Sequence, residues 1–193
     1  YGMTFSEKLY VALSHHLNIF QRRRPVKTTD LFSNYEVILF GGERVGYDFI
    51  EVFKDLGQSF LCIDFDPDLV KELVASGINC KYGDAEDAEF LEEINISDAK
   101  MVVSTISDND VNDFLFSQIK NPNEVIIVLL ATSVSNALHL YERGADYVIL
   151  PHFLGGHFVA ELAEKVGFDD ERFNEEKRKH IIYLEQRRSL GHS

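Results

Sequence analysis

The chain has 193 residues, with 32 Asp and Glu against 19 Lys and Arg and a formal net charge of −13. This acidic balance argues against a nucleic-acid-binding protein, because such proteins need a basic face for the phosphates. Hydrophobic residues make up 45% of the chain, which is enough for a packed core and excludes wholesale disorder. The length fits one compact domain with an appendage.

The charge is unevenly distributed. Residues 35–170 carry 26 acidic against eight basic residues, whereas both ends are slightly basic, with three arginines at 22–24. No stretch reaches the roughly 18 apolar residues that a membrane span requires. The two cysteines, Cys62 and Cys80, lie in apolar stretches without a C-x-x-C motif, so we expect buried free thiols.

Residues 1–34 predict a helix followed by a linker. Leu9, Leu13 and Leu17 fall on one face at helical spacing, after a capping serine at position 6. Pro25 stops this helix, and the short polar stretch that follows leads into the next segment. We therefore expect an N-terminal joining helix outside the main domain.

Residues 35–150 alternate between apolar strand patterns and amphipathic helix patterns. The predicted strands cover residues 35–40, 60–63, 78–82, 100–105, 125–130 and 147–150, and the helices begin at residues 45, 67, 88, 108 and 133. Continuous apolar strands separated by helices predict a parallel sheet covered on both faces. The expected fold class is therefore α/β, a Rossmann-like, doubly wound, six-stranded parallel sheet, with its ligand crevice at the carboxyl ends of the strands.

Two further helices are predicted in residues 151–193, over 152–166 and 171–190, with a break at Gly167. Their apolar stripe is sparse, and a complete sheet leaves them little to cover in their own domain. We therefore interpret them as helices that dock on a second subunit.

The turn after the first strand carries a nucleotide-binding pattern with one departure. The dinucleotide motif is G-x-G-x-x-G, and Gly41 and Gly46 match it while Glu43 stands at the second glycine position. Asp64 ends the second strand, 23 residues after Gly41, where an acid accepts the ribose hydroxyls. The alternative interpretation is a tight turn without a ligand.

The carboxylate of Glu43 repels a pyrophosphate by its charge. Three outcomes stay open: no phosphate binds, a mononucleotide binds without crossing Glu43, or a cation bridges the two groups. The neighbouring Arg44 could supply compensating charge.

Residues 35–150 resemble the regulators of K⁺ conductance, the RCK or TrkA-N family. The motifs that carry the resemblance are VILFGGERVG, CIDFDPD, YGDAED, MVVSTISD and GADYVILP. The resemblance implies a cytosolic nucleotide-binding domain whose ligand is NAD, NADH, AMP, ADP or ATP. It also implies that the helices after Pro151 cross over between the subunits of a homodimer.

Residues 5–24 resemble the segment that follows the last membrane helix in Kef-type cation:proton antiporters. The arginine run fits a position beside the cytoplasmic face of a membrane, near anionic lipids. The alternative interpretation is an ordinary surface helix with a basic end.

The resemblance also transfers a set of binding residues, position by position. The phosphate loop corresponds to residues 41–46, Asp64 to the ribose-binding acid, residues 65–66 to neighbours of the adenosine, residues 84–85 to a contact near the base, and residues 105–106 to the crevice wall. The predicted nucleotide-binding residues are Gly41, Gly42, Glu43, Arg44, Val45, Gly46, Asp64, Phe65, Asp66, Asp84, Ala85, Thr105 and Ile106. No catalytic residue and no metal site are predicted.

The resulting hypothesis is a cytosolic regulatory domain of a monovalent cation (K⁺ or Na⁺):proton antiporter, at the cytoplasmic face of the membrane. An adenine nucleotide would bias transport through a homodimer that is covalently linked to the membrane transporter. The alternatives are a K⁺ channel or K⁺ uptake subunit, and a degenerate domain that only dimerises. An NAD-dependent oxidoreductase is disfavoured, because nothing after the nucleotide domain is large enough for a substrate domain and no acid–base pair is evident.

Overall fold

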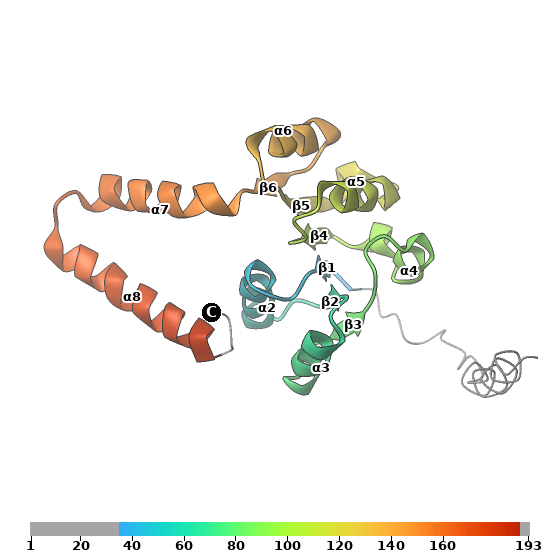
Figure 1. The fold of residues 1–193 in the computed structure, drawn as a ribbon, viewed down its shortest axis with the longest axis horizontal. Coiled ribbons are helices and arrows are strands. Elements are labelled where there is room, and N and C mark those ends of the chain that lie inside the picture. The colour runs from blue at the N-terminus through green and yellow to red at the C-terminus, as the bar shows by residue number, and fades with distance from the viewer. Residues whose placement is uncertain (1–34, 190–193) are drawn as a thin grey trace, which may run out of the picture. The chain divides into compact units, whose positions relative to one another are not determined.

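The computed structural model describes residues 35–189, which form a six-stranded sheet and seven α-helices, five of them beside the sheet (Figure 1). All strand pairs are parallel, in the order β3-β2-β1-β4-β5-β6. The strands are β1 (Val37–Phe40), β2 (Phe60–Asp64), β3 (Cys80–Tyr82), β4 (Met101–Ser104), β5 (Ile126–Leu130) and β6 (Tyr147–Ile149). The predicted doubly wound sheet is confirmed, while the predicted joining helix in residues 5–20 lies outside the described residues.

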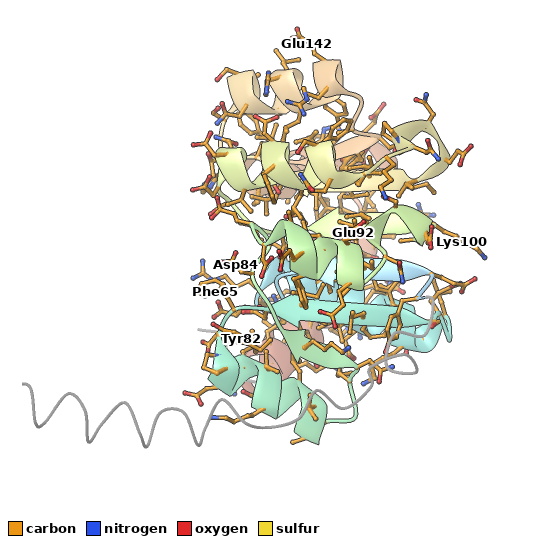
Figure 2. All side chains as sticks on the ribbon, turned by 90° about the vertical axis from the view of Figure 1, so that its right-hand side faces the viewer. Phe65, Tyr82, Asp84, Glu92, Lys100 and Glu142 are labelled. Atoms are coloured by element: carbon orange, nitrogen blue, oxygen red, sulfur yellow. The ribbon has the colours of Figure 1, made fainter. Side chains whose placement is uncertain are left out.

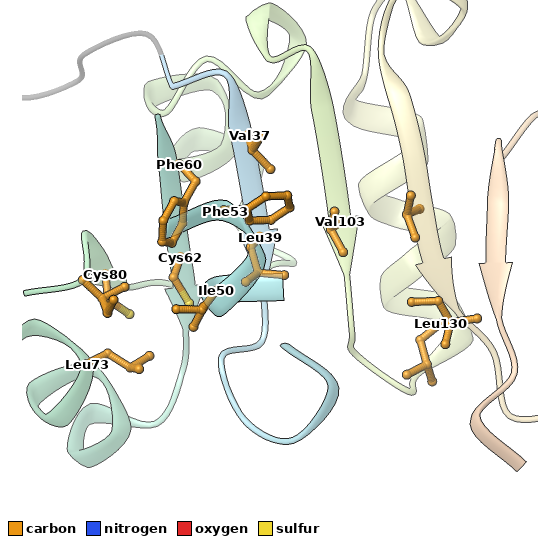
Figure 3. Close-up of a cluster of buried hydrophobic side chains, with 13 residues drawn as sticks. Val37, Leu39, Ile50, Phe53, Phe60, Cys62, Leu73, Cys80, Val103 and Leu130 are labelled. Atoms are coloured by element: carbon orange, nitrogen blue, oxygen red, sulfur yellow. The ribbon is translucent and has the colours of Figure 1, made fainter. Parts of the chain in front are cut away.

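The central strands are buried on both faces. Every residue of β1 and β2 is buried, as the uninterrupted apolar runs predict for a parallel sheet covered by helices. Figure 3 shows the cluster on one face, where Leu39 of β1 packs with Ile50 and Phe53 of the first helix and Leu73 of the next. This packing fixes the position, relative to the sheet, of the loop between β1 and that first helix.

Side-chain caps begin most of the helices that follow a strand. Asp66, Asp87 and Asp108 each accept hydrogen bonds from two backbone N–H groups of the first turn, and Ser133 accepts one. The helices are α2 (Val45–Asp55), α3 (Pro67–Ala75), α4 (Ala88–Glu93), α5 (Asn109–Gln118), α6 (Val134–Arg143), α7 (Pro151–Val166) and α8 (Asp170–Ser189). The exception among helices α2–α6 is α2, which has no side-chain cap.

Several predicted boundaries differ from the observed ones by one or two residues, and two of these differences have a clear local cause. The third strand begins at Cys80 rather than residue 78, because the N–H of Ile78 turns back to the carbonyl of Leu73 at the end of α3. Helix α5 ends at Gln118 rather than residue 120, because Ile119 already has an extended backbone. Both differences arise where a helix end competes with a neighbouring element for the same residues.

The last two helices leave the sheet. None of the 16 residues of α7 is buried, and α8 turns back so that its end approaches α2 (Figure 1). Within residues 35–189, no helix is long and apolar enough to cross a membrane. The two cysteines are buried free thiols, as predicted.

Candidate functional site

The candidate site lies at the carboxyl end of β1, where the order of the strands in the sheet reverses. Strand β1 pairs with β2 on one side and β4 on the other, so the connections leave it in opposite directions. A crevice forms outside such a switch point, and ligands of open α/β sheets bind there. The glycine turn of residues 41–46 joins β1 to α2 at this position.

Gly41 begins the turn in a conformation that favours glycine. Its φ is +86°, and an added Cβ would lie 2.4 Å from the hydroxyl oxygen of Thr105. That hydroxyl lies 3.1 Å from the carbonyl oxygen of Phe40 and 3.2 Å from that of Gly41, to which it donates. Thr105, at the end of β4, therefore fixes the turn from the neighbouring strand.

Gly42 and Gly46 lie beneath the crevice rather than on its surface. A Cβ on Gly46 would stand 1.9 Å from the carbonyl oxygen of Gly41, and one on Gly42 would stand 2.7 Å from Leu73 and 3.0 Å from the sulfur of Cys62. Gly46, the third glycine of the motif, and Gly42 are therefore required by close packing of the turn itself, independent of any ligand.

Asp64 connects the glycine turn to the next helix. Its Oδ2 accepts the N–H of Gly42 at 2.8 Å, and its Oδ1 accepts the N–H of Asp66 at 2.9 Å. The side chain is buried among the strand ends, yet it also lines the crevice. Each carboxylate oxygen keeps a second lone pair, which is the acceptor that a ribose diol requires.

Glu43 and Arg44 stand at the mouth of the crevice. Their side chains form a loose ion pair, with 3.9 Å between Nε and Oε2, and both are largely exposed. Arg44 is the residue before α2 and has φ +42°, a left-handed value that is uncommon for a residue with a side chain. The carboxylate at the second glycine position is therefore accommodated in a largely exposed position.

Two adjoining cavities make up the crevice, with volumes of about 550 and 360 Å³. They share Gly41, Asp64, Phe65 and Ile106. Among the predicted binding residues, the larger one is lined by Gly41, Glu43, Arg44, Val45, Asp64, Phe65, Asp66, Thr105 and Ile106, and the smaller one adds Asp84 and Ala85.

The smaller cavity lies over β2 and β3. Figure 2 shows Phe65, Tyr82 and Asp84 at the same edge of the domain, with Lys100 at the opposite edge. Phe65 is 74% exposed, so its ring is available to cover a flat group. Asp84 accepts the N–H of Glu86 at 2.9 Å, which holds the loop after β3 beside this cavity.

Asp66 has a structural function that its predicted role as an adenosine neighbour did not include. Its Oδ1 accepts the N–H of Asp68 at 2.8 Å and caps α3. It lines the larger cavity, but its carboxylate is already engaged by the helix.

Asn112 is a site-forming residue that the sequence analysis missed. It is fully buried on α5, and its amide group donates to the carbonyl oxygen of Ile106 at 2.8 Å and to that of Leu130 at 2.9 Å. It thereby ties together the ends of β4 and β5, which wall the larger cavity. The available signal was a polar residue three and four positions before the core residues Leu115 and Phe116.

The arrangement is suited to binding an anionic ligand. No side chain caps the N-terminus of α2, and Arg44 and Val45 at this helix start line the crevice, where the helix dipole favours an anion. In the part of the chain that the structure describes, no three His, Cys, Asp or Glu side chains gather in a way that could hold a metal ion.

Comparison with known proteins finds similarity to parts of potassium-transport proteins. It is 31% identical over 153 residues to potassium channel protein 1 of Methanocaldococcus jannaschii, covering 77% of this chain and 45% of that protein. It is 26% identical over 133 residues to the glutathione-regulated potassium-efflux system protein KefC of Cronobacter sakazakii, covering 68% of this chain and 22% of that protein. The chain therefore spans less than half the length of these relatives.

Solved structures share the fold. The TrkA-N domain of the Escherichia coli inner membrane protein ybaL superposes with a TM-score of 0.61 at 22% identity, over 66% of this chain and 96% of that one. The Kef C-terminal domain of Shewanella denitrificans in its AMP-bound form gives 0.56 at 20% identity, over 80% and 95%. The GsuK channel bound to NAD gives 0.55 at 18% identity, over 72% and 25%.

The family model of the TrkA-N domain matches residues 37–151, from the first residue of β1 to the first residue of α7. This match covers the whole sheet, the glycine turn and every residue that lines the two cavities except His152. The chain therefore belongs to the TrkA-N domain family, in agreement with the resemblance that its motifs suggested.

Proposed function

We propose that this chain is the regulatory domain of a monovalent cation:proton antiporter and that it binds an adenine nucleotide in the crevice at the end of β1. The observation that carries the proposal is the position of Asp64, which lines both cavities and hydrogen-bonds the glycine turn. A ribose on Asp64 would place its phosphate toward the N-terminus of α2 and its base toward the smaller cavity. The AMP-bound Kef domain supports this assignment.

Glu43 favours a mononucleotide over a dinucleotide in this proposal. Glu43 lines the larger cavity, so a second phosphate beside the glycine turn would come near its carboxylate. A charge of the same sign there opposes a pyrophosphate more than a single phosphate. We therefore rank AMP before NAD, although a solved relative of lower similarity has NAD bound.

The exposed apolar residues of α7 support a homodimer. Phe153, Phe158 and Val159 are between 57% and 60% exposed in the single chain. Ile126 and Tyr147 are also half exposed. They lie on the sheet face that carries α2, because each stands two residues before a buried member of the core cluster, Val128 or Ile149. A second copy that covers both surfaces would remove this apolar area from water.

Regulation in this proposal requires no catalysis by the domain. A nucleotide that binds one arrangement of the dimer more tightly shifts the population toward it, and this shift biases the attached transporter. Residues 1–34 would join the domain to a membrane-embedded part of a longer protein, with the domain on the cytoplasmic side.

A regulatory subunit of a K⁺ channel is the second candidate, because the 31%-identical relative is a potassium channel protein. The two candidates predict different transport by the longer protein in vesicles. An antiporter couples K⁺ or Na⁺ movement to a proton gradient, whereas a channel conducts K⁺ without one.

Titration calorimetry with AMP, ADP, ATP, NAD⁺ and NADH tests the nucleotide assignment. We expect saturable binding of AMP with a stoichiometry of one per chain. Absence of heat with all five nucleotides would contradict the ligand and favour a degenerate domain that only dimerises.

A further inference from the structure

Helix α8 returns to the start of α2, where two of its side chains contact Asp48 of that helix and Arg44 of the glycine turn. The hydroxyl of Tyr183 donates to the carboxylate of Asp48, 3.1 Å from Oδ1 and 3.2 Å from Oδ2. Nη2 of Arg187 donates to the carbonyl oxygen of Arg44 at 2.5 Å, and Nη1 lies 3.7 Å from Oδ1 of Asp48. These contacts join residues more than 130 positions apart in the sequence.

Arg187 is enclosed at this contact. Its guanidinium carbon lies 5.4 Å from the ring centre of Tyr47 and 5.7 Å from that of Tyr183, and its side chain is 14% exposed. Stacking of a guanidinium between aromatic rings is geometrically specific, unlike a surface ion pair between mobile chains. The contact is therefore a specific docking site for the end of α8, which we call the seat of Arg187.

The seat coincides with the part of the site that would receive phosphate. Arg44 immediately precedes α2, lines the larger cavity and has the left-handed φ of +42°. A residue with a side chain adopts such a backbone at a cost, and surrounding contacts must hold it there. Helix α2 has no side-chain cap of its own. The hydrogen bond from Arg187 of α8 to the Arg44 carbonyl therefore helps to fix this peptide.

We propose that α8 is a clamp on the phosphate loop and that Arg187 and Tyr183 are positioning residues of the nucleotide site. The docked helix holds the Arg44 peptide so that the first N–H groups of α2 face the crevice. Release of the helix lets the loop relax and weakens phosphate binding. Binding free energies are reciprocal, so a bound nucleotide strengthens the docking of α8 by the same factor.

This inference rests on the proposed function and adds a route by which nucleotide binding would affect the dimer. Helix α8 follows α7, which carries the apolar surface proposed for dimerisation. Nucleotide occupancy at the crevice would therefore be transmitted to the dimer through the clamp, from the Arg44 peptide to α8 and along to α7.

Calorimetry with AMP on the full chain tests the clamp. We expect Arg187→Ala and Tyr183→Phe each to weaken AMP binding by at least about fivefold, the lower end of the usual coupling between linked sites. Tyr183→Phe keeps every charge, so its effect separates positioning from the electrostatic attraction of Arg187. Arg178→Ala is the matched control, because Arg178 donates to Asn174 within α8 itself, and we expect AMP binding unchanged.

Hydrogen exchange provides the reciprocal measurement. We expect AMP to slow amide exchange in the last two turns of α8 in the wild-type chain and in Arg178→Ala, but not in Tyr183→Phe. A wild-type chain that binds none of the nucleotides overturns the proposed function. A wild-type chain that binds AMP, beside a Tyr183→Phe variant that binds it equally well, overturns only the clamp.

Discussion

The carboxylate of Asp64 accepts the backbone N–H of Gly42 at 2.8 Å, across 22 residues of sequence. The acid that defines the predicted ribose site therefore also stabilises the turn that defines the predicted phosphate site. A change at Asp64 alters both the shape of the empty crevice and its ability to accept hydroxyl groups, so its effects on stability and on binding must be measured separately.

Asp64→Asn should lower the free energy of unfolding by about 1–3 kcal/mol, because one amide group cannot accept both backbone N–H groups that the carboxylate accepts. Urea denaturation measures this loss. Asp68→Asn is the control, since Asp68 is exposed and only pairs with Lys71, and it should change stability by less than about 0.5 kcal/mol. Equal effects of the two variants would contradict the structural role of Asp64.

Glu43→Gly should increase the affinity for NAD⁺ more than that for AMP. It restores the second glycine of the motif and removes a negative charge near the position of the second phosphate. At water-like screening, removing that repulsion should raise the affinity about fivefold. Calorimetry with both ligands gives the ratio. Glu43→Gln keeps the bulk and removes only the charge, so a gain in Glu43→Gly alone would assign the exclusion to size.

Asn112→Leu should destabilise the fold by about 1–3 kcal/mol, because it leaves the carbonyl oxygens of Ile106 and Leu130, the second of them in a buried bond, without this donor. It should also weaken AMP binding, because the ends of β4 and β5 are no longer tied. Chemical denaturation and calorimetry measure the two effects. Ser117→Ala, on the exposed side of the same helix, should alter neither.

Phe153→Asp combined with Phe158→Asp should convert a dimer into a monomer without lowering the melting temperature of the single chain. Both rings are about 60% exposed, so they contribute little to the core of one copy. Light scattering coupled to size exclusion gives the mass. Val52→Asp replaces an exposed apolar residue of α2 and should leave the mass unchanged, and a Phe double variant that stays dimeric would refute the assignment of α7.

The order of strands and helices was predictable because it depends on neighbouring residues. Uninterrupted apolar runs become buried parallel strands, and caps such as Asp108 and Ser133 begin helices within a few residues of where the pattern places them. The predicted binding residues after β1, β2, β3 and β4 meet at one edge because parallel strands all end there. These inferences required no knowledge of contacts between distant residues.

The remaining features depend on such contacts, and only the tertiary structure decided them. The Asn112 amide shows its role only once Ile106 and Leu130 lie beside it, and the seat of Arg187 on Arg44 exists only because α8 turns back toward α2. The sequence alone determined a Rossmann-like TrkA-N sheet with a glycine turn and an acid at its carboxyl edge. The structure decided how that edge is held, because hydrogen bonds between residues far apart in the chain leave no periodic pattern in the sequence.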